Sequence, residues 1–495
     1  MAARVSRGIW IWLAALVPFI VLCTANSAMY RYAASDEAFY IPAVLLDLQP
    51  AAFPRDAALI VSQARLTLVD ETIAGLARWT GAGLPALFAV LYVTTLVLLA
   101  AAVWLIARRV YRTVWGAVAL LTVLTLRHAI WRTGTNTLEG YFHPRQLAFA
   151  FGALGLAALL RRRVPAAAGA LVLAAIVHPT TALWFGIWFG AAAAVMQPRW
   201  RRPLAGVCAA GLIAGMWALT VGPLAGRVAR MDPEWVATLA SKDYLFPLEW
   251  PLTAWMLNLL YVPVIVLLYR RRRALGLVDD PETGMVAGVL SLALVFAAIL
   301  PANAARVALA VQLQPARMFW MLDFVAVIYV TWALAEGAAP REARAGLAAA
   351  CLIVLSMARS VYLKGVLFPD RPLALIDIRD DDWGRAMAWA RQTDLGSGWL
   401  ADPMHAVHHG ASLRAAAGRD VLVEAVKDAA VGLYDRRTAI RTRDRLQAVG
   451  DFGSLSAERA RAIGATYDLD YLIAEREFPL PVAFESGAVR VYRLR

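Results

Sequence analysis

The sequence has few cysteines and few charged residues. Cys23, Cys208 and Cys351 each fall within an apolar run and have no spacing typical of metal ligands, so neither a disulfide framework nor a zinc site is indicated. Charged residues make up 17% of the chain, against about 25% in an ordinary soluble domain. The sequence also has no phosphate-binding loop, no dinucleotide-binding fingerprint and no nucleophile-elbow motif, which argues against three common classes of enzyme.

Apolar residues are in excess. They form 60% of the 495 residues and gather in runs of about 20, the length that a helix needs to cross ~30 Å of hydrocarbon. This pattern predicts a polytopic α-helical membrane protein. The net charge of +13 comes from arginines that lie in short clusters between the runs. In that position arginines are topology signals, so a nucleic-acid partner is not expected, whereas contact with membrane lipids is.

About eleven apolar runs qualify as membrane-spanning candidates. They are 8–25, 84–107, 113–131, 145–160, 164–178, 180–197, 203–222, 252–269, 284–302, 316–336 and 344–362. Residues 1–24 have a basic start and an apolar middle but no convincing cleavage pattern. We therefore expect an uncleaved first helix rather than a signal peptide.

The arginine clusters predict how these helices are oriented. With the N-terminus in the cytoplasm, all six basic helix ends fall on the cytoplasmic side: Arg4/Arg7, Arg108/Arg109/Arg112, Arg161–Arg163, Arg199/Arg201/Arg202, Arg270–Arg273 and Arg341/Arg344. The opposite face then receives the long loop 26–83 and the C-terminal region. We predict a multi-pass protein of the bacterial inner (plasma) membrane with its C-terminal region outside the cytoplasm.

The chain divides into two predicted domains. Residues 1–363 form the transmembrane domain, and the amphipathic spacing at 43–48 and 57–79 of its outer loop is typical of helices at the membrane interface. Residues 364–495 have denser charge and the alternating texture of a soluble α/β unit. Lys427, Arg414 and Arg419 could face a cavity on its membrane side, although charges on a small α/β unit usually lie on its solvated face. Strands are expected at 398–403 and 470–475, helices at 382–392 and 456–467, and a hairpin at 482–494.

Two adjacent acids, Asp36 and Glu37, follow the first apolar run within the segment SDEAFY. On the outer face, the Asp36 carboxylate would act as a general base toward a hydroxyl if burial or the charge of Glu37 raised its pKa. The same residues fit a helix start, with Ser35 as the N-cap and the acids in the first turn. The residue types alone leave both interpretations open.

Several polar residues stand at the outer ends of the predicted helices. His143 and Arg145 precede one apolar run, and Arg317 opens another with Gln314 beside it. An arginine at the outer rim opposes the positive-inside trend, so it is either a phosphate ligand or an interface anchor. His178 lies in a tight turn between two runs, where it is either functional or a cap of that turn.

The sequence assigns no metal ligands. His405, His408 and His409 have the helical spacing of zinc ligands, but they lack both the glutamate of the zinc-protease motif and a distant third ligand. A divalent metal is retained only as one means by which the chain could neutralise an anionic ligand. Arginine is another, because its planar fork matches phosphate oxygens.

The order of these features resembles the GT-C superfamily of polyprenyl-phosphate-sugar glycosyltransferases, which includes protein O-mannosyltransferases and the lipid A aminoarabinose transferase. The likeness lies in a cytoplasmic N-terminus, one helix, a long outer loop that opens with Asp-Glu and a nearby aromatic residue, many further helices and an outer α/β domain. It implies that Asp36 is the catalytic base or orients the acceptor, with Glu37 as its partner.

One residue departs from the family pattern. Pro42 lies within the helix that the family forms after the acids, and proline removes a backbone hydrogen bond there. The helix is therefore expected either to start later, at Ile41 or Pro42, or to be kinked. The segment 48–56 resembles the first loop of less characterised bacterial members and makes Asp56 a second candidate base.

The resemblance implies an inverting glycosyltransferase that moves a sugar from a polyprenyl-phosphate donor to a lipid, glycan or protein acceptor on the outer face. In that reaction Asp36 accepts the proton of the acceptor hydroxyl, and Arg145 and Arg317 hold the departing lipid phosphate. One alternative is a transporter or flippase of a lipid-linked substrate, which would place charges near the bilayer midplane. Another is a membrane-anchored binding or assembly protein whose outer domain carries the function.

Overall fold

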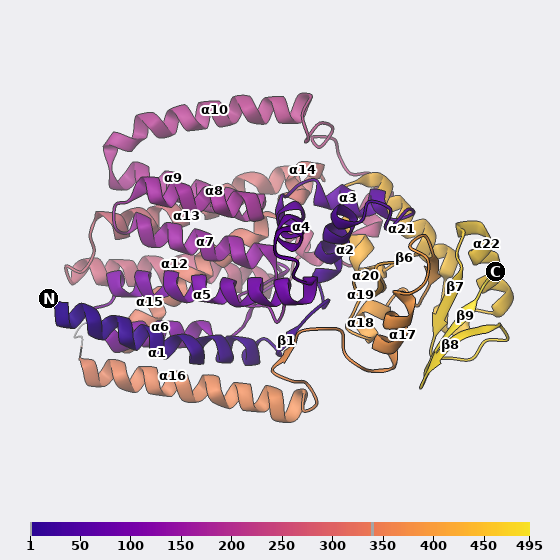
Figure 1. Ribbon diagram of the computed structural model, residues 1–495. Coiled ribbons are helices and arrows are strands. Elements are labelled where there is room, and N and C mark those ends of the chain that lie inside the picture. The colour runs from indigo at the N-terminus through magenta and orange to yellow at the C-terminus, as the bar shows by residue number, and fades with distance from the viewer. Residues whose placement is uncertain (1, 338–340) are drawn as a thin grey trace.

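The computed structural model describes residues 2–337 and 341–495. The side chains of residues 2–9, and with them the predicted basic cluster Arg4/Arg7, lie outside the described part. Figure 1 shows long helices that run side by side and, at one end of them, a smaller region of short helices and strands.

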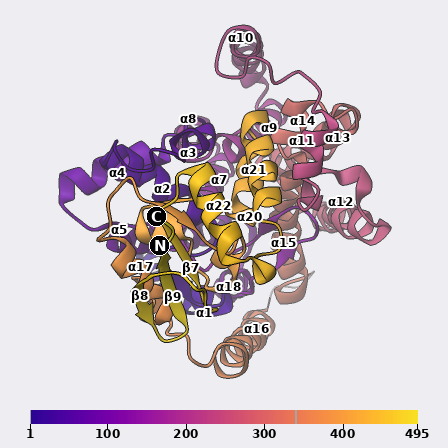
Figure 2. The same cartoon turned by 90° about the vertical axis from the view of Figure 1, so that its right-hand side faces the viewer.

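All eleven predicted apolar runs contain a helix. The helices are α1 (Ala2–Asn26), α5 (Leu84–Val110), α6 (Val114–Leu124), α7 (Pro144–Leu159), α8 (Val164–Val177), α9 (Pro179–Met196), α10 (Arg201–Thr220), α12 (Leu252–Ala274), α13 (Asp280–Ala304), α15 (Phe319–Ala335) and α16 (Glu342–Tyr362). No residue of α10 is buried, and Figure 2 shows this helix standing apart from the others. A long apolar helix exposed in this way is typical of one that faces lipid.

Seven helical segments of the described chain are long and apolar enough to cross a membrane. These are the segments that contain α5, α9, α10, α12, α13, α15 and α16. Helices α6, α7 and α8 are shorter, and so is the apolar part of α1. The structure is that of a polytopic helical protein, and eleven complete spans stay a prediction.

The predicted span 113–131 is wrong in its second half. Helix α6 has 11 residues, which cover about 17 Å at 1.5 Å per residue, roughly half of the hydrocarbon layer. The apolar run is interrupted by Arg127 and His128, and the chain continues into the short antiparallel pair β2 (Ala129–Ile130) and β3 (Thr135–Asn136).

Arginines from several helix ends lie together at one end of the bundle. Arg109 near the end of α5 donates to the carbonyl oxygen of Leu160, just beyond α7, at 3.1 Å. Arg272 near the end of α12 donates to the last carbonyl of α5 at 3.1 Å. Arg162 pairs with Asp280, the first residue of α13, at 3.0 Å. These contacts agree with the single orientation predicted from the sequence, and the compartment that this end faces stays a prediction.

The bundle core is packed by aromatic rings and small residues. Phe149 of α7 stacks on Trp320 of α15 with ring centroids 3.9 Å apart. A Cβ atom on Gly284 of α13 would lie 2.7 Å from the carbonyl oxygen of Ala192 in α9. Glycine therefore lets these two helices approach closely, as is usual in membrane bundles.

Loop 26–83, which is predicted to lie on the outer face and is called the first outer loop for that reason, folds into α2 (Glu37–Leu48), α3 (Ala57–Ala64) and α4 (Val69–Thr80). Helix α2 begins at Glu37 and continues through Pro42, so the prediction of a later start is wrong. Ser35 has a left-handed backbone, with φ 51°, and is not the N-cap of α2. That position is taken by Asp36, whose side chain makes no capping hydrogen bond. Asp36 and Glu37 therefore do stand at the helix start, as the sequence allowed, but the carboxylate of Asp36 is not used in a capping hydrogen bond.

The C-terminal region contains one mixed sheet of five strands in the order β6-β5-β7-β9-β8. The strands are β5 (Gly398–Leu400), β6 (Asp420–Val421), β7 (Tyr471–Ala474), β8 (Val482–Ser486) and β9 (Val489–Arg493), with helices α17 (Asp382–Ala390), α18 (His405–His408), α19 (Leu413–Ala417), α20 (Ala425–Val431), α21 (Arg436–Val449) and α22 (Ala457–Tyr467). The predicted strand 470–475, the two helices and the terminal hairpin are confirmed, whereas the strand predicted at 398–403 ends at Leu400. Gly487 makes the hairpin turn with φ 55°.

Short elements join the two parts at the end away from the arginine clusters. Strand β1 (Tyr30–Arg31) of the first outer loop pairs in parallel with β4 (Ala374–Leu375), which precedes the five-stranded sheet in the chain. Helices α11 (Pro233–Thr238) and α14 (Ala308–Gln312) belong to the segments that connect the long helices. The sheet region lies over the ends of the bundle in Figures 1 and 2.

Candidate functional site

A polar cavity of about 200 Å³ lies where the first outer loop, the helix ends and the C-terminal region meet. Its lining comprises Asp36, Phe39, Tyr40, Gln63, Gly134, His143, His178, Lys242, Tyr244, Gln314, Arg317, Val426, Lys427, Ala430, Leu433 and Tyr434. Five of the eight residues singled out from the sequence are among them: Asp36, His143, His178, Gln314 and Arg317. The structure therefore brings together residues that are spread over almost 300 positions of the chain.

Asp36 contributes the one carboxylate of this lining. Its Oδ1 accepts a hydrogen bond from Nζ of Lys427 at 2.8 Å, its Oδ2 lies 3.4 Å from Nε2 of His143, and 32% of its side chain is exposed. Burial raises the pKa of this carboxyl, but the charge of Lys427 and the contact with His143 outweigh burial and hold the pKa well below its usual value. Asp36 is thus ionised at neutral pH.

His143 presents a neutral ring to that carboxylate. It is the N-cap of α7, and its Nδ1 accepts the backbone N–H of Arg145 at 3.1 Å. The ring proton is therefore on Nε2, the atom that faces Asp36. Burial, and after it the charge of Arg145, lower the pKa of His143 to about 4. A neutral imidazole orients the Asp36 carboxylate without cancelling its charge.

Three cations face the single carboxylate. Besides Lys427 they are Lys242, whose Nζ donates to the carbonyl oxygen of Val426 at 3.0 Å, and Arg317. Burial, and then the charge of Lys427, lower the pKa of Lys242. The Nε of Arg317 is buried and has no hydrogen-bond partner within the described chain. Because an unpartnered buried donor is unfavourable, it is suited to bind an anionic ligand.

Sequence reasoning missed Lys242, and for Lys427 it favoured a solvated face over the membrane-side cavity that it actually lines. Lys427 is only 9% exposed, because the C-terminal region packs against the first outer loop. Composition holds a signal that could have found both residues. The 49 basic residues include only three lysines, Lys242, Lys364 and Lys427, and two of the three line this cavity. A lysine kept among so many arginines marks a position suited to a compact ammonium on a flexible stem.

Gln314 and Tyr434 form another part of the wall. Gln314 has a left-handed backbone, with φ 50°, at the start of the 3₁₀ turn Pro315–Met318. Its Nε2 lies 3.1 Å from the hydroxyl oxygen of Tyr434, to which it donates. Its Oε1 is buried without a partner in the described part of the chain. The wall thus offers a free acceptor close in sequence to the free donor of Arg317.

An apolar groove of about 390 Å³ adjoins the polar cavity. Aliphatic and aromatic side chains dominate its lining, among them Leu59, Ile60, Leu183, Leu224, Leu309 and Val431. The groove and the cavity share Phe39, Tyr40, Gln63, His178, Lys427 and Tyr434. A ligand that occupied both would have an anionic or polar head and an apolar tail.

His178 stands where the cavity and the groove meet. It is the N-cap of α9, and its Nδ1 accepts the backbone N–H of Thr181 at 3.2 Å. The capping role that the sequence left open is therefore present. The ring nevertheless lines both the cavity and the groove, so capping fixes its orientation toward them.

Glu37 does not line the cavity. It is fully buried, and its carboxylate accepts the backbone N–H groups of Ala33 at 2.6 Å and Phe142 at 2.9 Å. Glu37 thus fastens the first outer loop to the segment before α7. The expectation that Glu37 would raise the pKa of Asp36 is wrong, because the nearest charge to Asp36 is the ammonium of Lys427.

Arg145 is buried behind His143 and is absent from the lining of the cavity. Its guanidinium lies 3.5 Å from Oε1 of Glu139 and donates weakly to the carbonyl oxygen of Gly134 at 3.4 Å. Direct contact between Arg145 and a phosphate is therefore not supported by this geometry. Its charge acts on the site through the lowered pKa of His143.

Asp56 lies outside both the cavity and the groove. Its carboxylate is fully buried, accepts Nε of Arg414 at 2.6 Å, pairs with Arg441 and lies 3.5 Å from Arg445. Burial raises the pKa of Asp56, but the charges of these arginines outweigh burial, so the pKa lies below its usual value. With its oxygens occupied by cations, Asp56 is not placed to act as a base and instead joins the first outer loop to the C-terminal region.

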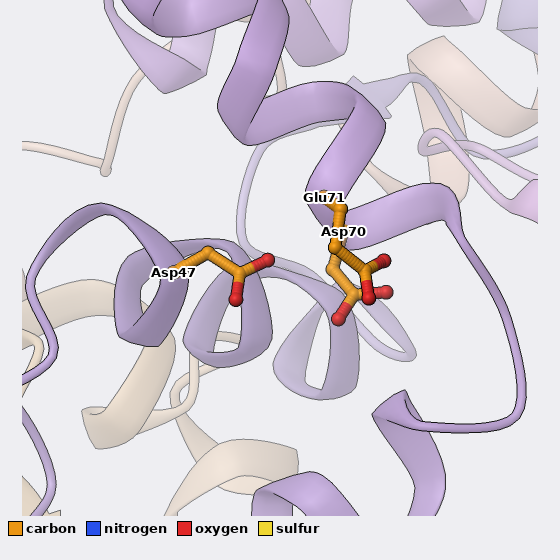
Figure 3. A group of neighbouring side chains, drawn as sticks. All are labelled: Asp47, Asp70 and Glu71. Carbon is orange, nitrogen blue, oxygen red and sulfur yellow. The ribbon is translucent and has the colours of Figure 1, made fainter.

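Figure 3 shows three further acids, Asp47, Asp70 and Glu71, that lie near one another; of these, Asp70 lines the groove. One carboxylate oxygen each of Asp47, Asp70 and Glu71 lie within 4.8 Å of one another. Burial, with the charges of Glu71 and Asp47 adding to it, raises the pKa of Asp70 to about 7. Carboxylates at this spacing could hold a divalent cation, but such groups are common without one, and we assign no metal to them.

The three histidines of the C-terminal region make different polar and stacking contacts, and His408 lies 3.2 Å from Asp402. Nε2 of His405 accepts the backbone N–H of Leu413 at 3.1 Å, and His409 stacks on Trp383 with ring centroids 4.1 Å apart. Within the part of the chain that the structure describes, they do not form a metal-binding group with one another.

The chain matches no protein-family model and no curated protein sequence. The fold defines a class, a polytopic helical protein whose C-terminal α/β region helps to enclose a polar cavity at one end of the bundle. Function has to be argued from the chemistry of that cavity.

Proposed function

We propose that this protein is an inverting glycosyltransferase whose donor is a polyprenyl-phosphate-linked sugar. The proposal rests on the cavity in which Asp36 faces Lys242, Lys427 and Arg317 next to an apolar groove. Such a donor needs both surroundings, because its phosphate is anionic and its lipid is apolar. The acceptor is a hydroxyl of a lipid, a glycan or a protein.

In the proposed reaction, the acceptor oxygen attacks the anomeric carbon of the sugar. A carbon–oxygen bond forms on one face while the bond to the phosphate oxygen breaks on the other, which inverts the configuration. Asp36 takes the proton of the acceptor hydroxyl as general base. Arg317 and the two lysines stabilise the phosphate that leaves with the lipid, and His143 keeps the carboxylate oriented.

We place the reaction at the outer face of a bacterial inner membrane. The support is the position of the arginine-rich helix ends, which lie together at the end of the bundle opposite the C-terminal region. Clusters of this kind favour the cytoplasmic side. On this proposal the eleven apolar helices form the transmembrane domain, and residues 364–495 lie outside the cytoplasm.

The test is sugar transfer in membranes that contain the protein. Labelled polyprenyl-phosphate sugars, such as mannose, glucose, arabinose and aminoarabinose, are supplied in turn, and label is counted in lipid, glycan and protein fractions. Asp36→Asn is expected to lower transfer about 10²- to 10⁴-fold at normal expression, the usual range for a lost general base. Asp47→Asn, an acid of α2 that lines neither the cavity nor the groove, is the matched control.

Two outcomes would contradict the proposal. Full transfer by Asp36→Asn at normal expression would remove the carboxylate from the reaction. Movement of labelled donor across the bilayer with no transfer to any fraction would instead support a transporter of the lipid-linked sugar.

A further inference from the structure

The C-terminal region supplies the cation that pairs with Asp36. Lys427 lies on α20, and its Nζ is 2.8 Å from Oδ1 of Asp36 and 5.1 Å from the ring centroid of Phe39. The two partners are separated by 391 residues in sequence. The contact therefore exists only because α20 packs over the first outer loop.

The backbone on both sides of Lys427 is held in place. The carbonyl oxygen of Val426 accepts a hydrogen bond from Lys242 at 3.0 Å. Asp428 binds Arg414 through both of its oxygens, and Arg414 in turn binds Asp56. These contacts hold the segment around Lys427, and its four-carbon stem lets the ammonium shift between nearby anions.

A phosphate in the cavity would compete with Asp36 for that ammonium. Lys242 and Arg317 line the same cavity, and the buried Nε of Arg317 has no partner within the described chain. Lys427 also lines both the cavity and the apolar groove. It therefore stands where the head group of an amphipathic phosphate would meet its tail.

The ion pair also conflicts with the proposed task of Asp36. A carboxylate that is neutralised by an ammonium at hydrogen-bond distance is a weak base, and the pair lowers the pKa of Asp36 well below its usual value. Besides Lys427, the carboxylate interacts with neutral His143, with Tyr40, Tyr141 and Glu139, and with the cation Lys242, while Arg317 lines the same cavity. Departure of Lys427 is thus the change that would make Asp36 a stronger base.

We propose that the ammonium of Lys427 changes its ion-pair partner from the Asp36 carboxylate to the phosphate of the bound lipid donor. In the empty site the ammonium holds the Asp36 carboxylate, and on donor binding it moves to the phosphate and releases the carboxylate to the acceptor hydroxyl. Donor binding therefore precedes proton abstraction. This inference rests on the proposed transferase function and adds the order in which its groups act.

In the exchange, Asp36 and the phosphate compete for the ammonium of Lys427. Removing the ammonium should therefore weaken phosphate binding, whereas removing the charge of Asp36 should strengthen it. The test measures binding of farnesyl phosphate, with farnesol as the uncharged reference, to purified protein in lipid nanodiscs. Lys427→Gln is expected to weaken farnesyl phosphate binding about 10-fold or more, the size of one lost charge-assisted hydrogen bond. Asp36→Asn is expected to strengthen it several-fold, since the ammonium is then free.

Controls separate exchange from a structural bridge. Lys427→Arg keeps the charge and should bind farnesyl phosphate more tightly than Lys427→Gln does, and Lys364→Gln, at the one lysine outside the cavity, should bind as the unmodified protein does. Farnesol binding should be the same in all variants. In the double variant Asp36→Asn/Lys427→Gln the gain from Asp36→Asn should disappear, because the two changes act through one contact.

The result that overturns the exchange is weaker phosphate binding in Asp36→Asn as well as in Lys427→Gln, or unchanged binding in both. Farnesol binding and thermal unfolding show whether a variant has simply lost its fold. The transferase proposal fails separately. If Asp36→Asn and Lys427→Gln change phosphate binding in opposite directions but no sugar is transferred, the exchange stands and the glycosyltransferase proposal fails. If sugar is transferred but the two variants do not change binding in opposite directions, the glycosyltransferase proposal stands and the exchange fails.

Discussion

Asp36 and Asp56 lie in the same outer loop, each just before a helix, and both bind cations of the C-terminal region. Asp56 is fully buried and held by three arginines, whereas Asp36 has 32% of its side chain exposed and is held by one lysine. Arginine forks bind a carboxylate in a fixed geometry, but an ammonium on a flexible stem is easily displaced. The same charge pairing therefore anchors one region and leaves the other open to a ligand.

The largest effect is expected when the anchor is removed. Asp56→Asn takes a buried counter-charge from Arg414, Arg441 and Arg445. Arg414 retains Asp428, but the loss should still cost about 3–5 kcal/mol of stability. Thermal unfolding in detergent and protease sensitivity of the C-terminal region measure this loss. Asp36→Asn, at the open site, should cost less than half as much, and equal destabilisation by the two variants would erase the distinction between anchor and site.

The pH dependence of stability below pH 7 should report on His143, the neutral histidine beside Asp36. His143 has a pKa of about 4 in the folded protein, against about 6.5 unfolded. Between these values the unfolded chain binds more protons, so stability falls as pH drops through this window, by up to about 3 kcal/mol.

His143→Gln should lose this acid-side slope. Unfolding measured from pH 7 to pH 4 is the readout, and His408→Gln, on the more exposed ring of the C-terminal region, is the control that should keep the slope. An unchanged slope in His143→Gln would show that the ring is not buried in its neutral form.

A smaller effect should separate Arg317 from Arg145. Loss of one hydrogen bond to a charged group costs about 1.5–3 kcal/mol, so Arg317→Gln is expected to raise the KM for the lipid donor roughly 10- to 100-fold. Arg145→Gln should change KM less, because Arg145 does not line the cavity. Equal rises in KM would place both arginines on the phosphate.

Much of the fold could be predicted because it depends on local pattern. Apolar length located all eleven helices, and alternation located strands β5 and β7 and the hairpin around Gly487. The span 113–131 was overestimated, since apolar length counts past Arg127 and His128, where the helix has already ended. Because Pro42 disfavours a helix interior, the sequence suggested a helix start at Ile41 or Pro42, but α2 begins at Glu37 and includes Pro42.

The site could be predicted in part. Asp36, His143, His178 and Arg317 stand at outer helix ends, where a consistent orientation already places them on one side. The separate positions of Glu37 and Asp56 could not be predicted in this way. Adjacent residues in the sequence point in different directions around a helix start, and the partners that decide their charge come from distant segments.

The sequence by itself determined the class of protein, the number of apolar helices and the end of the bundle at which polar residues gather, because hydrophobic length and arginine position act locally. Only the tertiary structure decided which acid stays open. Packing of α20 over the first outer loop brings Lys427 to Asp36 and Arg414 to Asp56. Contacts across more than 350 residues leave no local trace in the sequence, and the charge state of each carboxylate depends on them.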